Sequence, residues 1–214
     1  MPVILSKSHA ANLLSLEYYQ NSDYSLKEKS SFYLDDYDLT ITYHLFVNSK
    51  DGCLTMTSED ECIANITFTF PAHVDLIGDC VQIESAFVKR EYRQMFIGPT
   101  GYLSLLDTYN IVSDTEQTEI GVHLWRSKLA RMTEVEINIV KDLNTEFPTI
   151  VQDADGNDVV YQYEKNGNNP LDPEIWGYED PDPRMISSVI SPKINASMDE
   201  TRRDVVLLAK KNKF

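Results

Sequence analysis

The stretch YDLTITYHLFV, residues 37–47, decides the fold class that this chain is expected to adopt. Every second residue from Tyr37 to Val47 is apolar, whereas positions 38, 40, 42 and 44 between them are polar. A period of two is typical of a β-strand that buries one face and exposes the other. The residues that follow, NSKDG, are typical of a turn.

Similar patterns occur along much of the chain. They predict strands in CIANITFTF (62–70), VQIESAFV (81–88) and EVEINIV (134–140), and a hairpin across Asp155-Gly156 in TIVQDADGNDVVYQY (149–163). Because these strands do not alternate with helices, we expect a β-dominated α+β fold built as an antiparallel β-sandwich or a small barrel. The glycine- and proline-containing IGPTGYL (97–103) is expected to be a loop.

Helices are predicted mainly at the two ends of the chain. Residues 8–20 form a short helix that Ser8 can cap. Residues 197–214 begin with Ser197 and Glu200 at the spacing of a capping box and end in lysines, which favour the end of a helix. The region 113–132 has two interpretations. We favour a strand from about Thr118, and a helix that begins near Ser113 stays open.

The chain is expected to be one structural domain with extensions. The parts are an N-terminal helix and lead-in (1–35), an antiparallel β core (36–163), an extended proline-rich acidic arm (164–196) and the C-terminal helix (197–214). The arm contains NGNNPLDPEIWGYEDPDPRM (166–185), whose four prolines exclude a helix or a central strand. Its apolar side chains either seal the sheet of their own chain or reach a neighbouring subunit.

Charge supports a role for this arm in contacts between subunits. The arm is acidic and the C-terminal segment is basic, so the two can pair within one chain or between copies. The predicted interface residues are Leu171, Ile175, Trp176, Tyr178, Asp180, Asp182, Arg202, Arg203, Lys210 and Lys211.

Composition limits the kinds of partner. The chain has 214 residues, a net charge of −15 and a pI near 4.6, so its surface repels phosphate backbones and anionic membranes. We therefore expect no direct nucleic-acid partner and no membrane partner. The three cysteines and the lack of a recognisable secretory signal indicate reduced thiols and synthesis in the cytoplasm.

Motifs for metal, cofactor or catalytic chemistry are weak, and we predict neither a cofactor nor an enzyme. A zinc site from Cys53, Cys62, His73 and Cys80 lacks a closely spaced pair of ligands. DADGND (153–158) resembles a calcium loop, but its glycine falls fourth, so a hairpin turn is the better interpretation. Nucleotide-binding loops and the nucleophile elbow are absent from the sequence.

These observations predict a non-enzymatic structural subunit of a multi-protein assembly, with other protein subunits as partners in a homo-oligomer or a hetero-assembly. The assembly we favour is a virion, with the chain as a phage tail, connector or decoration component. Two alternatives stay open. One is a cytoplasmic adaptor module that uses the aromatic arm, and the other is a carboxylate-dependent hydrolase or lyase on a β scaffold.

Overall fold

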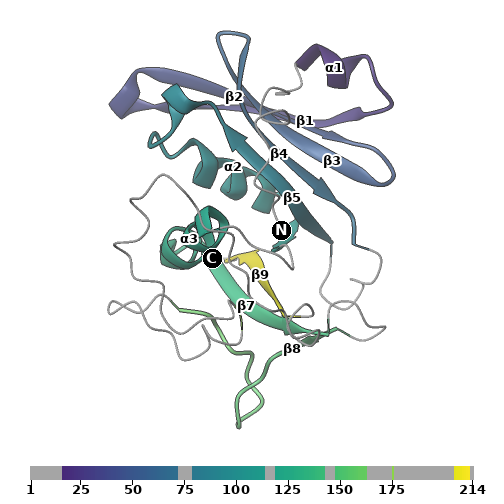
Figure 1. Cartoon of the computed structure of the whole chain (residues 1–214), viewed down its shortest axis with the longest axis vertical. Helices are drawn as coiled ribbons and strands as arrows, with labels where there is room; N and C mark the ends of the chain where they lie inside the picture. The colour runs from purple at the N-terminus through teal and green to yellow at the C-terminus, as the bar shows by residue number, and fades with distance from the viewer. Residues whose placement is uncertain are drawn as a thin grey trace. The chain divides into compact units, whose positions relative to one another are not determined.

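The structure is a computed structural model that describes residues 16–71, 79–113, 119–142, 148–162, 175 and 205–212. The chain divides into two compact units, which are described here one at a time. The N-terminal unit comprises Pro2–Pro71 and Val81–Tyr109, and the C-terminal unit comprises Ala72–Cys80 and Asn110–Phe214. Among the described residues of each unit, strands outnumber helices, which confirms the predicted β-dominated α+β class (Figure 1).

The N-terminal unit is an antiparallel meander in which each strand pairs with the next one along the chain. Its strands are β1 (Ser25–Leu34), β2 (Leu39–Val47), β3 (Asp51–Ser58), β4 (Glu61–Thr69) and β5 (Cys80–Val88), of which only Cys80 belongs to the other unit. The strands predicted from residues 37–47, 62–70 and 81–88 are confirmed. We did not predict β1, because SLKEKSSFYL does not alternate between apolar and polar residues, or β3, because the alternation in DGCLTMTS is limited to residues 54–57.

Helix α2 (Ile97–Leu106) lies along one face of this meander (Figure 1), so the predicted loop at 97–103 is wrong. Pro99 falls in the first turn of the helix, where a missing backbone N–H costs nothing. Gly101 lets the helix approach the sheet closely. A Cβ atom at position 101 would lie 2.7 Å from Met56 Cε and 2.9 Å from Ile66 Cδ1.

The opposite face of the same sheet packs against α1 (Leu16–Gln20). Tyr19 of this helix stacks on Phe46 with their ring centres 5.4 Å apart, and both pack against Cys53. The predicted helix at 8–20 is confirmed for residues 16–20, and the rest lies outside the described residues. His44 and Phe46 are buried, so the second half of β2 is buried on both faces and not on one.

The described part of the C-terminal unit contains four antiparallel strands in the order β6-β9-β7-β8. They are β6 (Asn110–Val112), β9 (Val206–Lys211), β7 (Val135–Lys141) and β8 (Thr149–Ile150). The strand predicted at 134–140 is confirmed as β7. The predicted hairpin continues beyond β8 through a bridge between Gln152 and Asp158, and Gly156 at its turn has a φ of 81°.

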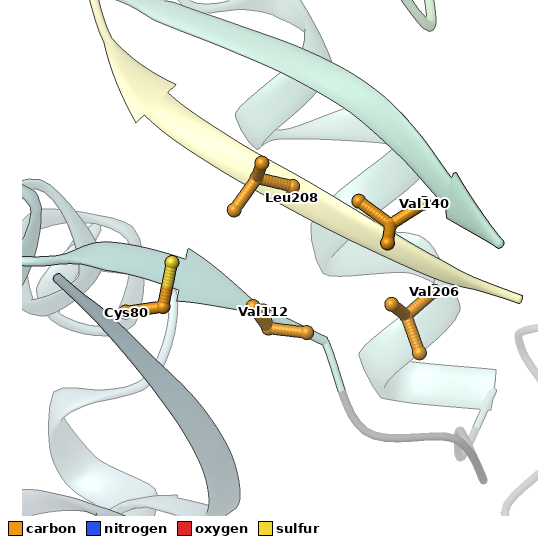
Figure 2. Close-up of a cluster of buried hydrophobic side chains, with 5 residues drawn as sticks. All are labelled: Cys80, Val112, Val140, Val206 and Leu208. Carbon is orange, nitrogen blue, oxygen red and sulfur yellow. The ribbon is translucent and has the colours of Figure 1, made fainter. Parts of the chain in front are cut away.

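The C-terminal helix predicted at 197–214 is wrong for residues 206–211, which form strand β9. Each residue from Val206 to Ala209 is buried, because β9 lies between β6 and β7 and has side chains packed on both faces. A continuous apolar run suits such a central strand as well as it suits a helix face. Figure 2 shows Val206 and Leu208 in a cluster of buried side chains with Cys80, Val112 and Val140.

The favoured strand in 113–132 is also wrong, because Glu119–Ser127 forms helix α3. Val122, Trp125 and Leu129 are buried at spacings of three and four residues, and this helical period outweighs the alternation seen near Ile120. Leu129 itself lies in η3 (Leu129–Arg131), a 3-10 turn that follows the helix.

The finer prediction of a sandwich or a small barrel is not confirmed. Within each unit the described strands form one row of hydrogen-bonded neighbours, without a facing sheet or a strand pair that closes a barrel. Among the same residues, no helix has the length and apolar character needed to cross a membrane.

Candidate interaction surface

Most of the predicted interface residues lie outside the described residues. Ile175 is the one described residue between positions 163 and 204, and it is half-buried with a helical backbone. Lys210 and Lys211 lie in strand β9. Lys210 stands opposite Glu136 across the β9–β7 pair, where unlike charges attract. The structure therefore places these two lysines in a sheet and not at a helix end.

The first feature that suits protein contacts is strand β1, which stands at the end of the strand order. Among the described strands it pairs only with β2. Lys29, Ser30 and Ser31 in its middle are exposed. Because adjacent strands bond along one edge only, the backbone groups on the other edge of β1 have no strand opposite them in the described residues.

A β-bulge fixes the start of this edge strand. The register with β2 shifts between Leu26 and Glu28, which leaves Lys27 as the extra residue. Lys27 Nζ donates a hydrogen bond to Tyr109 Oη at 2.7 Å, and Glu28 accepts one from Thr108 Oγ1 at 3.0 Å. Both charged side chains therefore join β1 to the segment that follows α2. From Glu28 to Leu34 the register is regular.

The second feature is the end of the N-terminal unit at which β1 turns into β2. This turn contains η1 (Asp35–Tyr37) and Asp38, a residue with a left-handed backbone at φ 49°. Tyr33 donates a hydrogen bond from its hydroxyl to Asp38 Oδ1, and Tyr37 donates one to the Gln94 carbonyl oxygen at 3.4 Å. The second bond brings Tyr37 to the loop that leads into α2.

That loop also exposes part of an aromatic side chain. Phe96 is 55% exposed and is one of two residues in the loop with a left-handed backbone, at φ 59°, the other being Gln94 at φ 74°. Left-handed backbone costs an L-residue roughly 1–2 kcal/mol. Such strain persists where the surrounding structure fixes it and is commonest at functional sites.

The thiols of this chain are not activated. Burial raises the pKa of Cys53 to about 11 and that of Cys80 to about 12, and it also raises the pKa of Cys62. A thiol with a raised pKa holds little thiolate at neutral pH and is a poor nucleophile or metal ligand. No group of three or more His, Cys, Asp or Glu residues within the described part of the chain is placed to hold a metal ion, and His73 of the weighed zinc set lies outside that part.

Two carboxyl groups with shifted pKa values are both stabilised as anions. The pKa of Glu61 is lowered by its hydrogen bond from Lys89, and the pKa of Asp153 is lowered by hydrogen bonds from Asn157 and neighbouring backbone groups. Asp153 Oδ1 accepts backbone N–H groups of Asp155 and Asn157, each at 2.9 Å. Asp153 thus has the role of a turn residue, which was the favoured interpretation of DADGND.

Sequence reasoning missed both features of this surface. The Asp-Asp pair in YLDDYDL, residues 33–39, was a usable turn signal, and it would have placed a hairpin between β1 and β2. The exposure of Phe96 had no comparable signal, because it depends on how α2 meets the sheet. The chain gives no match to a family model, to a curated protein or to a solved structure.

Proposed function

We propose that this chain is a non-enzymatic structural subunit of a multi-protein assembly and that it joins its neighbours through protein–protein contacts. The observation that carries the proposal is the outer edge of β1, which is long, regular after the bulge and solvent-exposed at its middle. An unpaired strand edge is a template for a strand of another chain, because its backbone donors and acceptors can form a new ladder.

The partner proposed for this edge is the β1 strand of a second copy. In an antiparallel pair centred on Ser31, Lys29 lies opposite Tyr33 of the second copy, and Glu28 lies opposite Leu34. Like charges therefore do not meet across the new pair, and a lysine side chain can lie against an aromatic ring. Such a contact uses the same surface on both chains, as a two-fold homodimer requires.

The class of assembly is proposed from the sequence alone, and a virion component stays our first proposal. A cytoplasmic adaptor is the second candidate, and the exposed rings of Tyr37 and Phe96 favour it because surface aromatics are enriched at contact sites. The alternative of a hydrolase or lyase requires a carboxyl group that can donate a proton, which a raised pKa favours. The pKa values of Glu61 and Asp153 are both lowered, so neither residue supports this alternative.

Light scattering on the purified chain across concentration tests this proposal. We expect a mass above the 24.5 kDa of one chain that rises with protein concentration. The edge contact is mostly backbone hydrogen bonding, so the mass should depend only weakly on salt. A chain that remains at 24.5 kDa at every concentration contradicts the self-assembling subunit and favours the adaptor.

A further inference from the structure

The regular part of the edge strand β1 has Ser31 at its middle. Its pairing with β2 runs without a register shift from Glu28 to Leu34, and Ser31 is the central residue of that segment. When two copies of one strand pair antiparallel about a two-fold axis, one residue lies on the axis and faces itself. A pair that uses the whole regular segment is therefore centred on Ser31.

Lys29 and Tyr33 lie on the same face of β1 as Ser31, because alternate residues of a strand share a face. The Ser31 hydroxyl oxygen lies 2.8 Å from Thr42 Oγ1 of β2, which identifies this face of the sheet. Lys29 is exposed, and so is Tyr33. In a pair centred on Ser31, Lys29 of each copy stands opposite Tyr33 of the other, so the contact occurs twice, once on each side of the axis.

A carboxylate lies at the tip of the Tyr33 ring. The Tyr33 hydroxyl donates a hydrogen bond to Asp38 Oδ1, and the Asp38 side chain is exposed in the β1–β2 turn. This hydrogen bond raises the pKa of Tyr33, so the hydroxyl stays protonated at neutral pH and remains the donor. An aromatic ring and a negative charge therefore stand together beside the outer edge of β1.

A lysine opposite Tyr33 can use both the ring and the carboxylate. Its aliphatic stem can lie along the ring, and its ammonium group then reaches the far end of the ring, where Asp38 accepts a charge-assisted hydrogen bond. Strand β1 contains two lysines. Lys27 already bonds to Tyr109 Oη at 2.7 Å, so Lys29 is the lysine that can reach a second copy.

We propose that β1 selects a second copy of the same chain through this contact, in which Lys29 of each copy binds the Tyr33 ring and the Asp38 carboxylate of the other. The inference rests on the proposed self-assembly through the β1 edge and adds the side chains that decide the partner. A backbone ladder accepts many strands, so specificity comes from the side chains across the pair. A strand that lacks a cation opposite Tyr33 leaves the Asp38 charge without its partner.

Two charge reversals on the full chain, studied by sedimentation velocity, test the proposal. Lys29→Glu brings two acids together across the pair, and Asp38→Lys brings two bases together, so each should raise the dissociation constant of self-association at least about thirtyfold. An equimolar mixture of the two variants restores opposite charges at both contacts. It should form a heterodimer with a dissociation constant within about tenfold of the wild-type value. A mixture of the folded variants that stays monomeric overturns the proposal.

Asp38→Asn decides the question if Asp38→Lys does not fold. Asparagine suits the left-handed backbone of position 38, at φ 49°, and its amide oxygen can still accept the Tyr33 hydrogen bond, so mainly the charge is lost. The dissociation constant should rise about fivefold. Asp60→Asn is the matched control, because Asp60 is also exposed with a left-handed backbone, at φ 68°, but lies in the β3–β4 turn. Equal effects of both variants would contradict the proposal.

The same measurements separate this inference from the function on which it rests. If the wild type self-associates and both Lys29→Glu and Asp38→Asn associate equally well, the edge assembly stands and the proposed contact is wrong. If the wild type stays monomeric at every concentration, both are wrong. Self-association that the two charge reversals remove and their mixture restores supports both.

Discussion

The ammonium group of Lys27 lies 2.7 Å from the hydroxyl oxygen of Tyr109 and 4.3 Å from the centre of the same ring. Lys27 is the bulged residue of β1, and Tyr109 is a mostly buried residue that packs against Phe68 and Phe70. The contact therefore connects the outermost strand to an aromatic cluster of its own unit. It holds β1 in place while its outer edge stays exposed.

Replacing Lys27 with methionine tests this connection. Lys27→Met keeps the length of the side chain but removes the hydrogen bond and the charge over the ring, so the free energy of unfolding should fall by about 1 kcal/mol. Denaturant unfolding measures the change. Lys29→Met on the same strand is the control and should stay within about 0.5 kcal/mol of the wild type. An equal loss in both variants would show that position 27 has no special role.

The close approach of α2 to the sheet predicts opposite results for two glycines of one helix. Gly101→Ala places a methyl group 2.7 Å from Met56 Cε, and we expect it to lower the free energy of unfolding by about 1–3 kcal/mol despite the better helix propensity of alanine. Gly98→Ala meets only Val88 Cγ2 at 3.8 Å and should cost nothing. Thermal unfolding of the two variants side by side decides the matter. A stabilised Gly101→Ala would contradict this packing.

Asn138 in the C-terminal unit is fully buried, and neither side-chain amide atom has a hydrogen-bond partner within the described part of the chain. An unsatisfied buried polar group costs about 1–3 kcal/mol. Asn138→Leu, opposite Leu208 on β9, should therefore raise the free energy of unfolding by a similar amount. Val140→Thr puts a hydroxyl at the neighbouring buried position of the same strand and should lower it. If Asn138→Leu is destabilising, a water or another partner satisfies the amide in solution.

His44 should make stability depend on pH. Burial, and then the positive charge of Lys29, lower the pKa of His44 below its ordinary value of 6.5. The unfolded chain therefore binds a proton more readily, so the stabilising contribution is complete above pH 6.5 and is lost as the pH falls towards the lowered pKa. The stability of His44→Gln should fall less than that of the wild type between pH 7.5 and 5.5.

Denaturant unfolding across this pH range measures the effect. His123→Gln serves as a second variant, because burial, Lys128 and Arg131 lower the pKa of His123 too. It should remove a further part of the same pH dependence. Parallel curves for the wild type and His44→Gln would rule out His44 as a source of the effect.

Sequence patterns were most reliable where apolar and polar residues alternate along a strand. The alternation from Tyr37 to Val47 identified β2 correctly, and the Asp155-Gly156 pair identified a hairpin. They failed where a strand consists of a continuous apolar run. The apolar run of β9 has no alternation, so the capping-box spacing before it and the lysines after it favoured a helix, whereas its place between β6 and β7 requires a strand.

Much of the candidate surface could not be predicted, because it arises from contacts between distant segments. Residues 97–103, predicted as a loop, lie in helix α2, which packs closely on the sheet where Gly101 meets Met56. Phe96, directly before this helix, is exposed. The open edge of β1 follows from its place at the end of the strand order, which local sequence does not encode. Only the acidic turn at Asp35 and Asp36 could have been identified from the sequence alone.

Amide hydrogen exchange along β1, compared between dilute and concentrated protein, tests the central claim most directly. Pairing at the outer edge should slow exchange of backbone amides within residues 28–34 at the concentrations where the mass rises. Ser31→Lys, which places a charge on the edge strand, should remove that protection, and Thr40→Lys on β2 should not. A mass that rises while exchange along β1 stays unchanged would contradict assembly through this edge.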